Sequence, residues 1–329
     1  MKYSRVRIDS FGYELPPNVV SSEDLENRLQ PLYRKLRLQK GQLEALTGIQ
    51  ERRYWDTGYR VSDGAIHAGM KAIAASSVPV EEIGMLIYGA VCRDHIEPAT
   101  ACTVSHGLQL HPQAQVANAI ELGQIRAGLA VACEASREVV ERTIDRMNDT
   151  GDMEFFKKNI ATLTGGSGAV AVLLADRSLS ENGHRLLGGT ARHANEFHRL
   201  CMWGGQTERA SDGQHFIETD AMGILSNGVT LGQATFREFR KELGWDESRP
   251  DRIVCHQVGE THQKHILRAI DLTEDRDFTT FRYLGNIGSV SLPLTAAIAS
   301  EREFLARGDS VGFLGIGSGL NCLMLGVHW

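Results

Sequence analysis

The stretch SVGFLGIGSGLNCLMLGVHW (310–329) consists of two apolar runs joined by a glycine-rich turn. Apolar runs of this length, bounded by turn residues, are typical of strands that are covered on both faces. Two similar runs, AGLAVACEAS (127–136) and SGAVAVLLAD (167–176), occur earlier in the chain. The two pairs of strands predict an α/β unit that is present twice.

The segments around these pairs repeat the same order of elements. In the first half we expect strands at 5–15 and 82–92 and helices at 62–76 and 98–110. In the second half we expect strands at 185–194 and 252–258 and helices at 223–244, 261–272 and 291–308. No low-complexity linker separates the halves, so we place them at 1–177 and 178–329, packed face to face.

Composition restricts the class of protein. The 329 residues are 42% hydrophobic and 23% charged, with a net charge of −6, which suits a soluble globular protein with a real core. No stripe of Lys and Arg with interleaved aromatics occurs, which argues against nucleic acid as a partner. No signal peptide or membrane span is recognisable, so we expect a cytoplasmic protein whose six scattered cysteines are free thiols.

The stretch HPQAQVANAIELGQ (111–124) breaks the repeat. It predicts a helix with no strand leading into it, whereas in the second half the strand RIVCHQV (252–258) leads into a helix. A strand and two or three helical turns, roughly 15 to 18 residues, would restore the symmetry. We therefore predict that a segment is missing between Gln115 and Val116. Loss of an interior strand would leave backbone groups unpaired and a slot in the core.

Two polar residues are candidates for a site at the end of the second-half sheet. His256 in CHQVGETH (255–262) follows a buried strand directly, where open α/β sheets place their site residues. Asn286 lies between glycines in RYLGNIGSVSLP (282–293), where the backbone can approach a ligand closely. Together they could stabilise a developing oxyanion such as an enolate. The alternatives are a structural histidine and a turn asparagine.

Three other motifs bear on chemistry. The loop CRDHIEPATAC (92–102) places Glu97 after a buried strand, as a solvated loop residue or as a general base. The turn GIGSGLN (315–321) precedes a strand instead of a helix, so it is not a dinucleotide-binding loop but can offer backbone N–H groups to a carbonyl oxygen. The paired histidines in HANEFH (193–198) and HQKH (262–265) lack acidic or cysteine partners, and we predict no metal site.

With these motifs in place, nearly the whole chain resembles the thiolase superfamily, in its β-ketoacyl-acyl-carrier-protein synthase III branch. The resemblance depends on TGIQERRYWD near the start, CHQV, LGNIGSVS thirty residues later and the terminal GIGSGLN turn. RDHIEPATA and GIGSGLNC look most similar to the OleA-type thiolases, which join two acyl-CoA chains head to head in long-chain olefin synthesis. The resemblance implies a duplicated thiolase fold in five layers, α-β-α-β-α, and an obligate homodimer.

The resemblance also implies Claisen condensation through a Cys–His–Asn triad. It assigns His256 and Asn286 to the oxyanion hole and to proton handling. Ser318 would contribute its backbone N–H to a second oxyanion hole beside the acyl-cysteine. Glu97 would match the glutamate that, in the olefin enzymes, reaches the partner subunit's site and helps to remove the α-proton of the second acyl chain.

The nucleophile itself cannot be assigned. The family's cysteine lies at the end of a strand, where the following helix lowers the thiol pKa, and that position falls between Gln115 and Val116. Three interpretations follow. The printed sequence lacks residues that the protein contains, the protein is a genuinely deleted and inactive homologue, or Cys92 or Cys133 replaces the missing nucleophile. Each remaining cysteine can instead be a small buried apolar residue.

The resemblance implies coenzyme A thioesters as substrates, with no cofactor. In synthase III proteins an aromatic residue and an arginine before the TGI turn contact the nucleotide, and here GQLEAL holds neither. Our hypothesis is Claisen condensation of acyl-CoA to a β-keto product, related to fatty acid or hydrocarbon synthesis. The alternatives are decarboxylative condensation with malonyl-acyl-carrier protein, which needs no base, and an inactive thiolase-fold protein that serves as an acyl-binding module or dimer partner.

Overall fold

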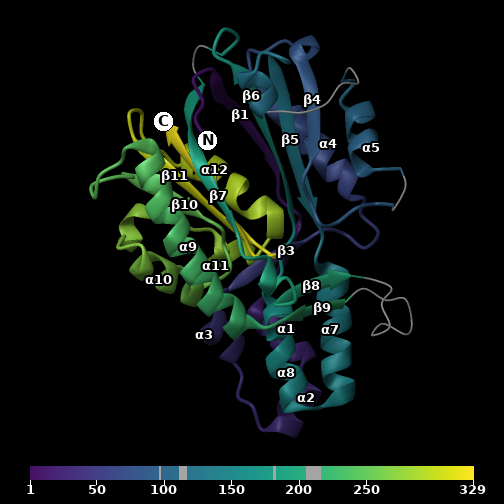
Figure 1. The fold of residues 1–329 in the computed structure, drawn as a ribbon. Helices are drawn as coiled ribbons and strands as arrows, with labels where there is room; N and C mark the ends of the chain where they lie inside the picture. Colours follow the sequence, from purple (N-terminus) through teal and green to yellow (C-terminus); the bar gives the residue numbers. More distant parts are fainter. Residues whose placement is uncertain (96–97, 111–116, 181–182, 205–215) are drawn as a thin grey trace.

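A single mixed sheet of eight strands runs through the molecule (Figure 1). The computed structural model describes residues 1–95, 98–110, 117–180, 183–204 and 216–329. The strand order is β10-β11-β12-β7-β1-β6-β5-β4. The strands are β1 (Val6–Glu14), β4 (Ile83–Tyr88), β5 (Ala127–Glu134), β6 (Gly168–Asp176), β7 (His184–His193), β10 (Arg252–Cys255), β11 (Ser310–Gly317) and β12 (Asn321–His328).

The sheet is built from one arrangement used twice. In the first half β4 pairs with β5 in parallel, and β5, β6 and β1 follow in antiparallel pairs. In the second half β10 pairs with β11 in parallel, and β11, β12 and β7 follow in antiparallel pairs. The halves join where β1 meets β7, over two residue pairs. The prediction of a duplicated α/β unit is confirmed.

Helices cover both faces of each half and produce five layers. The outer face of the first half carries α4 (Val61–Ala74) and α5 (Thr100–Gly107), and the outer face of the second carries α9 (Ala221–Leu243) and α10 (Glu260–Ala269). Between the halves lie α12 (Ser291–Glu301) and α6 (Ala117–Glu121), which contact strands of the sheet. The predicted order α-β-α-β-α is therefore present.

The central layer is close-packed because α12 is apolar on all sides. Ala296 and Ala299 are completely buried against the core that contains Val6 and Phe313, while Leu294 packs against Val170 on β6. Small residues let a helix approach two sheet surfaces at once, and helices that are hydrophobic all round are buried. The start of α12 is consequently a fixed point for the loop that precedes it.

The remaining elements form a smaller lobe at the end of the sheet where β10 stops (Figure 1). A core of buried leucines with Ile144, Met147 and Phe156 holds it together. Residues 137–159, to which the sequence analysis assigned no element, are helical here. The lobe elements are β2 (Asn18–Ser21), α1 (Ser22–Arg28), α2 (Gln30–Leu36), α3 (Gln42–Thr47), β3 (Glu51–Tyr54), α7 (Arg137–Thr150), α8 (Met153–Asn159), β8 (Cys201–Gly204), β9 (Phe216–Thr219) and α11 (Phe281–Leu284).

The prediction of an interior gap in the sheet was wrong. The junction of Gln115 and Val116 lies outside the described residues, but β4 pairs directly with β5, so the sheet is continuous. In the second half the segment equivalent to the predicted missing strand reaches the sheet, among the described residues, through an isolated Ile253–Asp277 bridge beside β10. Its counterpart in the first half would lie along β4, at the edge of the sheet. Chain order suggested an interior position, but the strand order is not the chain order.

Among the described residues, no helix is long and apolar enough to cross a membrane.

Candidate active site

His256 is fixed at the carboxyl end of β10. Its backbone N–H donates to the carbonyl of Leu314 on the neighbouring strand β11, at 3.0 Å. Burial, and then the nearby His262, lower the pKa of His256 to about 4. The imidazole is therefore neutral at pH 7, with one N–H to donate and one nitrogen to accept. A neutral donor in a water-poor site suits a developing oxyanion.

Gln257 connects the end of β10 to the loop that carries Asn286, a role that the sequence analysis missed. Its side chain is buried and donates to the carbonyl of Cys255 at 2.7 Å. Its Oε1 accepts from the backbone N–H groups of Thr280 and Phe281, where α11 begins. Its own N–H donates to Ser291 Oγ, at the start of α12. These bonds fix both ends of the segment 280–291 relative to His256.

Asn286 is held in place through its backbone, and the Nδ2 of its side-chain amide has no hydrogen-bond partner among the described residues. Its N–H donates to Thr164 O and its carbonyl accepts from Gly166 N–H, both at 2.9 Å. The side-chain Oδ1 accepts from Gly288 N–H at 3.1 Å, which sets the orientation of the amide. No described residue accepts a hydrogen bond from Nδ2. A ligand oxygen can therefore take that donor.

The glycines on either side of Asn286 are required by this geometry. Gly285 has φ +69°, and a Cβ there would lie 2.6 Å from Thr164 O. Gly288 has φ +58°, and a Cβ there would press on Glu134 at 3.3 Å. Residues that carry a Cβ rarely adopt a positive φ of this kind. The glycines of GNIG thus let the loop pack closely against Thr164 and Glu134, and close approach to a ligand stays a prediction.

Glu134 supports the same loop from the other half of the molecule. It ends β5 with its side chain 2% exposed. Its carboxylate accepts from Ser289 Oγ at 2.7 Å and from the N–H groups of Val91 and Cys92 at 3.0 and 3.1 Å. It therefore joins the turn after Asn286 to the loop that leads toward Glu97. The sequence showed only an acidic residue at the end of an apolar run.

Glu134→Gln is expected to lower the free energy of unfolding by about 2 kcal/mol. The substitution replaces one carboxylate oxygen with an NH₂ group, which would face the N–H and O–H donors that the oxygen now accepts from. Chemical denaturation measures this loss. The matched control is Glu138→Gln on exposed α7 surface, expected to change stability by less than about 0.5 kcal/mol. Equal stability of the two variants would show that the Glu134 network contributes nothing.

Of the other two predicted site residues, Ser318 and Glu97, the structure describes only Ser318. Ser318 is exposed in the turn between β11 and β12, at the same end of the sheet as His256, and its carbonyl accepts from Asn321 Nδ2 at 2.6 Å. Glu97 lies outside the described residues. Among the described residues, no group of three or more His, Cys, Asp or Glu side chains is placed to hold a metal ion.

The cysteines considered as replacement nucleophiles are in unfavourable environments. Burial raises the pKa of the Cys92 thiol, and the neighbouring Glu134 carboxylate raises it further. The same two causes raise the pKa of Cys133, whose side chain is completely buried. Reactive cysteines instead have lowered pKa values and electropositive surroundings. The geometry therefore argues against Cys92 and Cys133 as thiolate nucleophiles.

Fold and site together define a condensing enzyme of the thiolase type. Residues 241–329 match the family model described as 3-Oxoacyl-[acyl-carrier-protein (ACP)] synthase III C terminal. The whole chain superposes on a crystal structure of Xanthomonas campestris OleA with a TM-score of 0.92 and 32% identity, covering 99% of that chain. The solved OleA structures include variants at a cysteine, a histidine and a glutamate.

Full-length relatives narrow the assignment. The acyl-CoA:acyl-CoA alkyltransferase of Shewanella oneidensis is 47% identical, with both chains covered completely. That of Xanthomonas campestris is 33% identical, again over both full chains. The chain belongs to the family of acyl-CoA:acyl-CoA alkyltransferases.

The comparison with the S. oneidensis protein also bears on chain length. It runs over 349 positions, whereas this chain has 329 residues, so at least 20 compared positions have no counterpart here. That number is large enough to contain a strand and the start of a helix.

Proposed function

We propose that this protein condenses two acyl-CoA molecules head to head into a β-keto product, with enolate formation at His256 and Asn286. The observation that carries the proposal is the pair of prepared donors, a neutral imidazole and an amide whose Nδ2 has no described partner. A structure of an OleA cysteine variant with bound lauric acid and lauroyl-CoA, 32% identical to this chain, supports acyl-CoA as the substrate. Coenzyme A enters as part of the substrate, and no cofactor takes part.

The enolate step moves one proton and one electron pair. The Cα–H bond of the second acyl-CoA breaks, the proton goes to the carboxylate of Glu97, and the electrons move onto the thioester oxygen. His256 and Asn286 donate hydrogen bonds to that oxygen and lower the barrier. The carbanion then attacks the carbonyl of the first acyl group, a C–C bond forms, and the thiolate that carried this group leaves.

The acyl-carrying thiolate is the part that the 329 residues do not supply. The family position for the cysteine falls at Gln115–Val116, and the thiols beside the site have raised pKa values. We propose that the 329-residue chain carries the enolate-forming half of the reaction and that the first half needs a segment absent from it.

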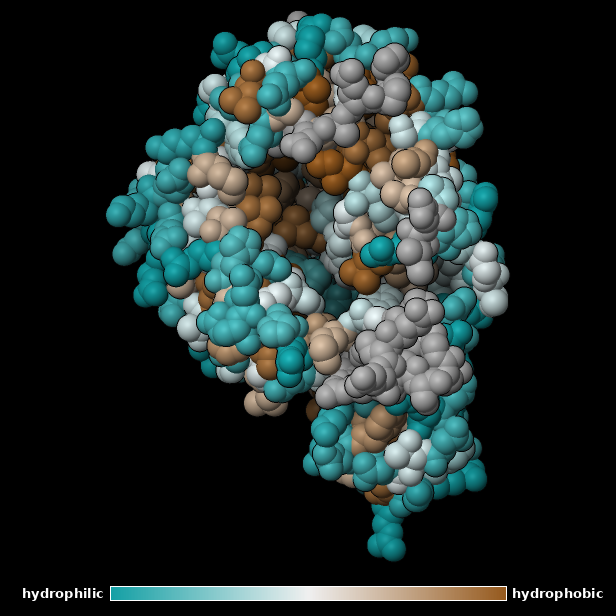
Figure 2. Space-filling view, turned by 45° about the vertical axis from the view of Figure 1, so that its right-hand side comes forward, coloured by the Kyte–Doolittle hydropathy of each residue, from teal (hydrophilic) through white to brown (hydrophobic). Residues whose placement is uncertain are grey.

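An apolar hollow is consistent with binding of acyl chains. Figure 2 shows the face of the molecule hollowed near its centre, with hydrophobic residues on the walls of the hollow. Clefts with apolar walls and a few convergent polar groups are the usual form of small-molecule sites.

The proposal includes a homodimer in the cytoplasm, in which Glu97 of one subunit acts in the site of the other. No described strand pairs with the outer side of β4, whose Ile87 is 46% exposed. The strand that we predict to be missing would lie there and would itself form the sheet edge that faces a partner subunit. Unpaired strand edges are ready surfaces for pairing with another chain. Acyl-carrier protein is the carrier that the decarboxylative alternative would need.

Glu97→Ala distinguishes the two condensations. We expect exchange of the α-hydrogens of acyl-CoA in D₂O to fall at least about 100-fold, because a general base is lost. Decarboxylation of malonyl thioesters needs no base and should be unchanged. Mass spectrometry of the recovered thioester measures both reactions, and exposed Glu81→Ala is the control. Decarboxylation without any exchange in the parent protein favours the alternative condensation, and binding without either reaction favours an acyl-binding module.

A further inference from the structure

A row of polar and basic residues crosses four strands at the end of the sheet opposite His256. The register pairs Arg7 on β1 with Arg185 on β7, Arg185 with His328 on β12, and His328 with Ser310 on β11. Residues directly opposite one another on neighbouring strands project from the same face of a sheet. The row therefore presents two guanidinium groups and an imidazole on the face that α9 covers.

The row is electrostatically unfavourable by itself. Arg7 and Arg185 are like charges directly opposite each other, an arrangement that destabilises a sheet. Burial, and then Arg185 and Arg177, lower the pKa of the Arg7 guanidinium. Arg7 Nε is buried with no hydrogen-bond partner, and no described carboxylate forms an ion pair with Arg7 or Arg185. Violations of this kind are expected where a ligand is bound.

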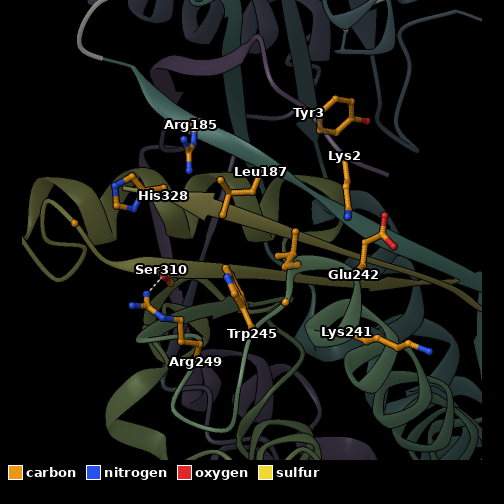
Figure 3. Close-up of a pocket in the computed structure, with 13 residues that line it drawn as sticks. Lys2, Tyr3, Arg185, Leu187, Lys241, Glu242, Trp245, Arg249, Ser310 and His328 are labelled. Carbon is orange, nitrogen blue, oxygen red and sulfur yellow. Dashed lines mark hydrogen bonds between the residues drawn. The ribbon is translucent and has the colours of Figure 1, made fainter.

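Three members of the row, Arg185, His328 and Ser310, line one wall of a cavity of about 660 Å³ (Figure 3). Arg7 is opposite Arg185 on the neighbouring strand and is not itself a lining residue. The end of α9 and the turn after it contribute Lys241 and Trp245 to the lining. Arg249 also lines the cavity, where it donates to Ser310 Oγ and pairs with Asp251 at 3.2 Å. Lys2 adds a further cation. Among the described lining residues, Glu242 is the single carboxylate, and it already pairs with the amino-terminal ammonium group at 3.0 Å.

This cavity is separate from the proposed active site. β11 begins at Ser310, in the cavity, and pairs with the end of β10 through Leu314, whose carbonyl binds His256. Leu314 is four residues along β11 from Ser310, a distance of about 13 Å at the usual rise per residue. The cavity thus lies at the amino end of β11, whereas His256 follows the carboxyl end of the parallel strand β10.

We propose that this cavity binds the phosphate groups of a nucleotide. Guanidinium groups match phosphate oxygens in pairs, and lysines add point charges. The indole of Trp245 and the phenol of Tyr3, which also line the cavity, offer apolar surface to a base. The volume lies in the range of small-molecule sites. The shared chemistry is a nucleoside phosphate, either free or as the 3′-phosphorylated ADP part of coenzyme A.

Calorimetric titration of the full chain with ADP, adenosine 3′,5′-bisphosphate and pyrophosphate tests this site. We expect saturable binding with Kd below about 1 mM that weakens with added salt. Arg185→Gln should raise Kd at least about tenfold, since a paired guanidinium–phosphate contact is lost. If adenosine 3′,5′-bisphosphate binds more tightly than ADP, and Arg185→Gln also weakens the binding of coenzyme A, then coenzyme A is the source of the nucleotide. Equal binding of ADP identifies a free nucleotide.

The matched control is Arg192→Gln, on the same strand but paired with Glu238 outside the cavity. It should leave Kd unchanged, and both variants should keep the α-hydrogen exchange rate measured at saturating acyl-CoA, since neither residue lies in the enolate site. Absence of saturable binding of all three probes, or equal weakening by the two substitutions, would overturn the proposal. Because exchange is measured separately, loss of this site is distinguishable from failure of the proposed function.

Discussion

The 329-residue protein, incubated with a long-chain acyl-CoA, is expected to gain no acyl mass. Formation of an acyl-enzyme requires a thiolate, and burial raises the pKa of the thiols of Cys92, Cys133, Cys255 and Cys322. Cys133 is completely buried, so an acyl-CoA carbonyl cannot reach its sulfur. Intact-mass spectrometry before and after incubation measures the result directly.

Insertion of the missing segment should reverse that result. If the unmatched S. oneidensis residues include a cysteine and correspond to Gln115–Val116, a variant that carries them there should form one acyl adduct per chain and release β-keto product. The strand order permits the insertion, because a strand added along β4 lies at the edge of the sheet and displaces no existing pair. A helix that follows the strand would lower the thiol pKa at its amino end.

Two matched chains make the test decisive. In one, the inserted cysteine is replaced by alanine, which should fold as the insertion variant does but form no adduct. The other is the unmodified chain. An adduct on the unmodified chain would contradict the expectation, and peptide mapping to Cys92 or Cys133 would then identify a replacement nucleophile. If the purified protein already exceeds its 329-residue mass by roughly 15 to 18 residues, the printed sequence lacks residues that the protein contains.

The sequence predicted the parts of this molecule that depend on local pattern. Apolar runs located the strands of both halves, and the positions of His256 and Asn286 followed from a strand end and a pair of glycines. Helix α7 was not predicted, although Val140, Ile144 and Met147 have helical spacing.

What the sequence could not give are relations between distant segments. Glu134 contacts Ser289 across 155 positions, and no periodicity connects them. The opposition of Arg7 and Arg185 depends on which strands pair and in what register. The predicted interior position of a missing strand was wrong for the same reason, since strand order in a sheet is decided by packing of both faces and not by order along the chain.

Asn286→Asp and His256→Ala are each expected to slow α-hydrogen exchange of acyl-CoA by about 100- to 1,000-fold, the usual cost of one oxyanion donor. Asn286→Asp is the sharper variant. It keeps an oxygen that can accept from Gly288 N–H, so the loop retains its conformation, but it replaces the Nδ2 donor with a second oxygen. Malonyl-thioester decarboxylation passes through the same enolate and should fall equally, unlike in Glu97→Ala.

Binding and chemistry can be separated with the same proteins. Acyl-CoA binding should change only a few-fold, because the donors act mainly on charge that develops in the transition state. His265→Ala, an exposed histidine one helical turn beyond His262 on α10, is the control and should retain full exchange. The double variant should lose little more than either single one, since two donors to one oxygen act as a unit. Full exchange in Asn286→Asp would contradict the assignment, because the free amide hydrogen is the one feature that this substitution removes.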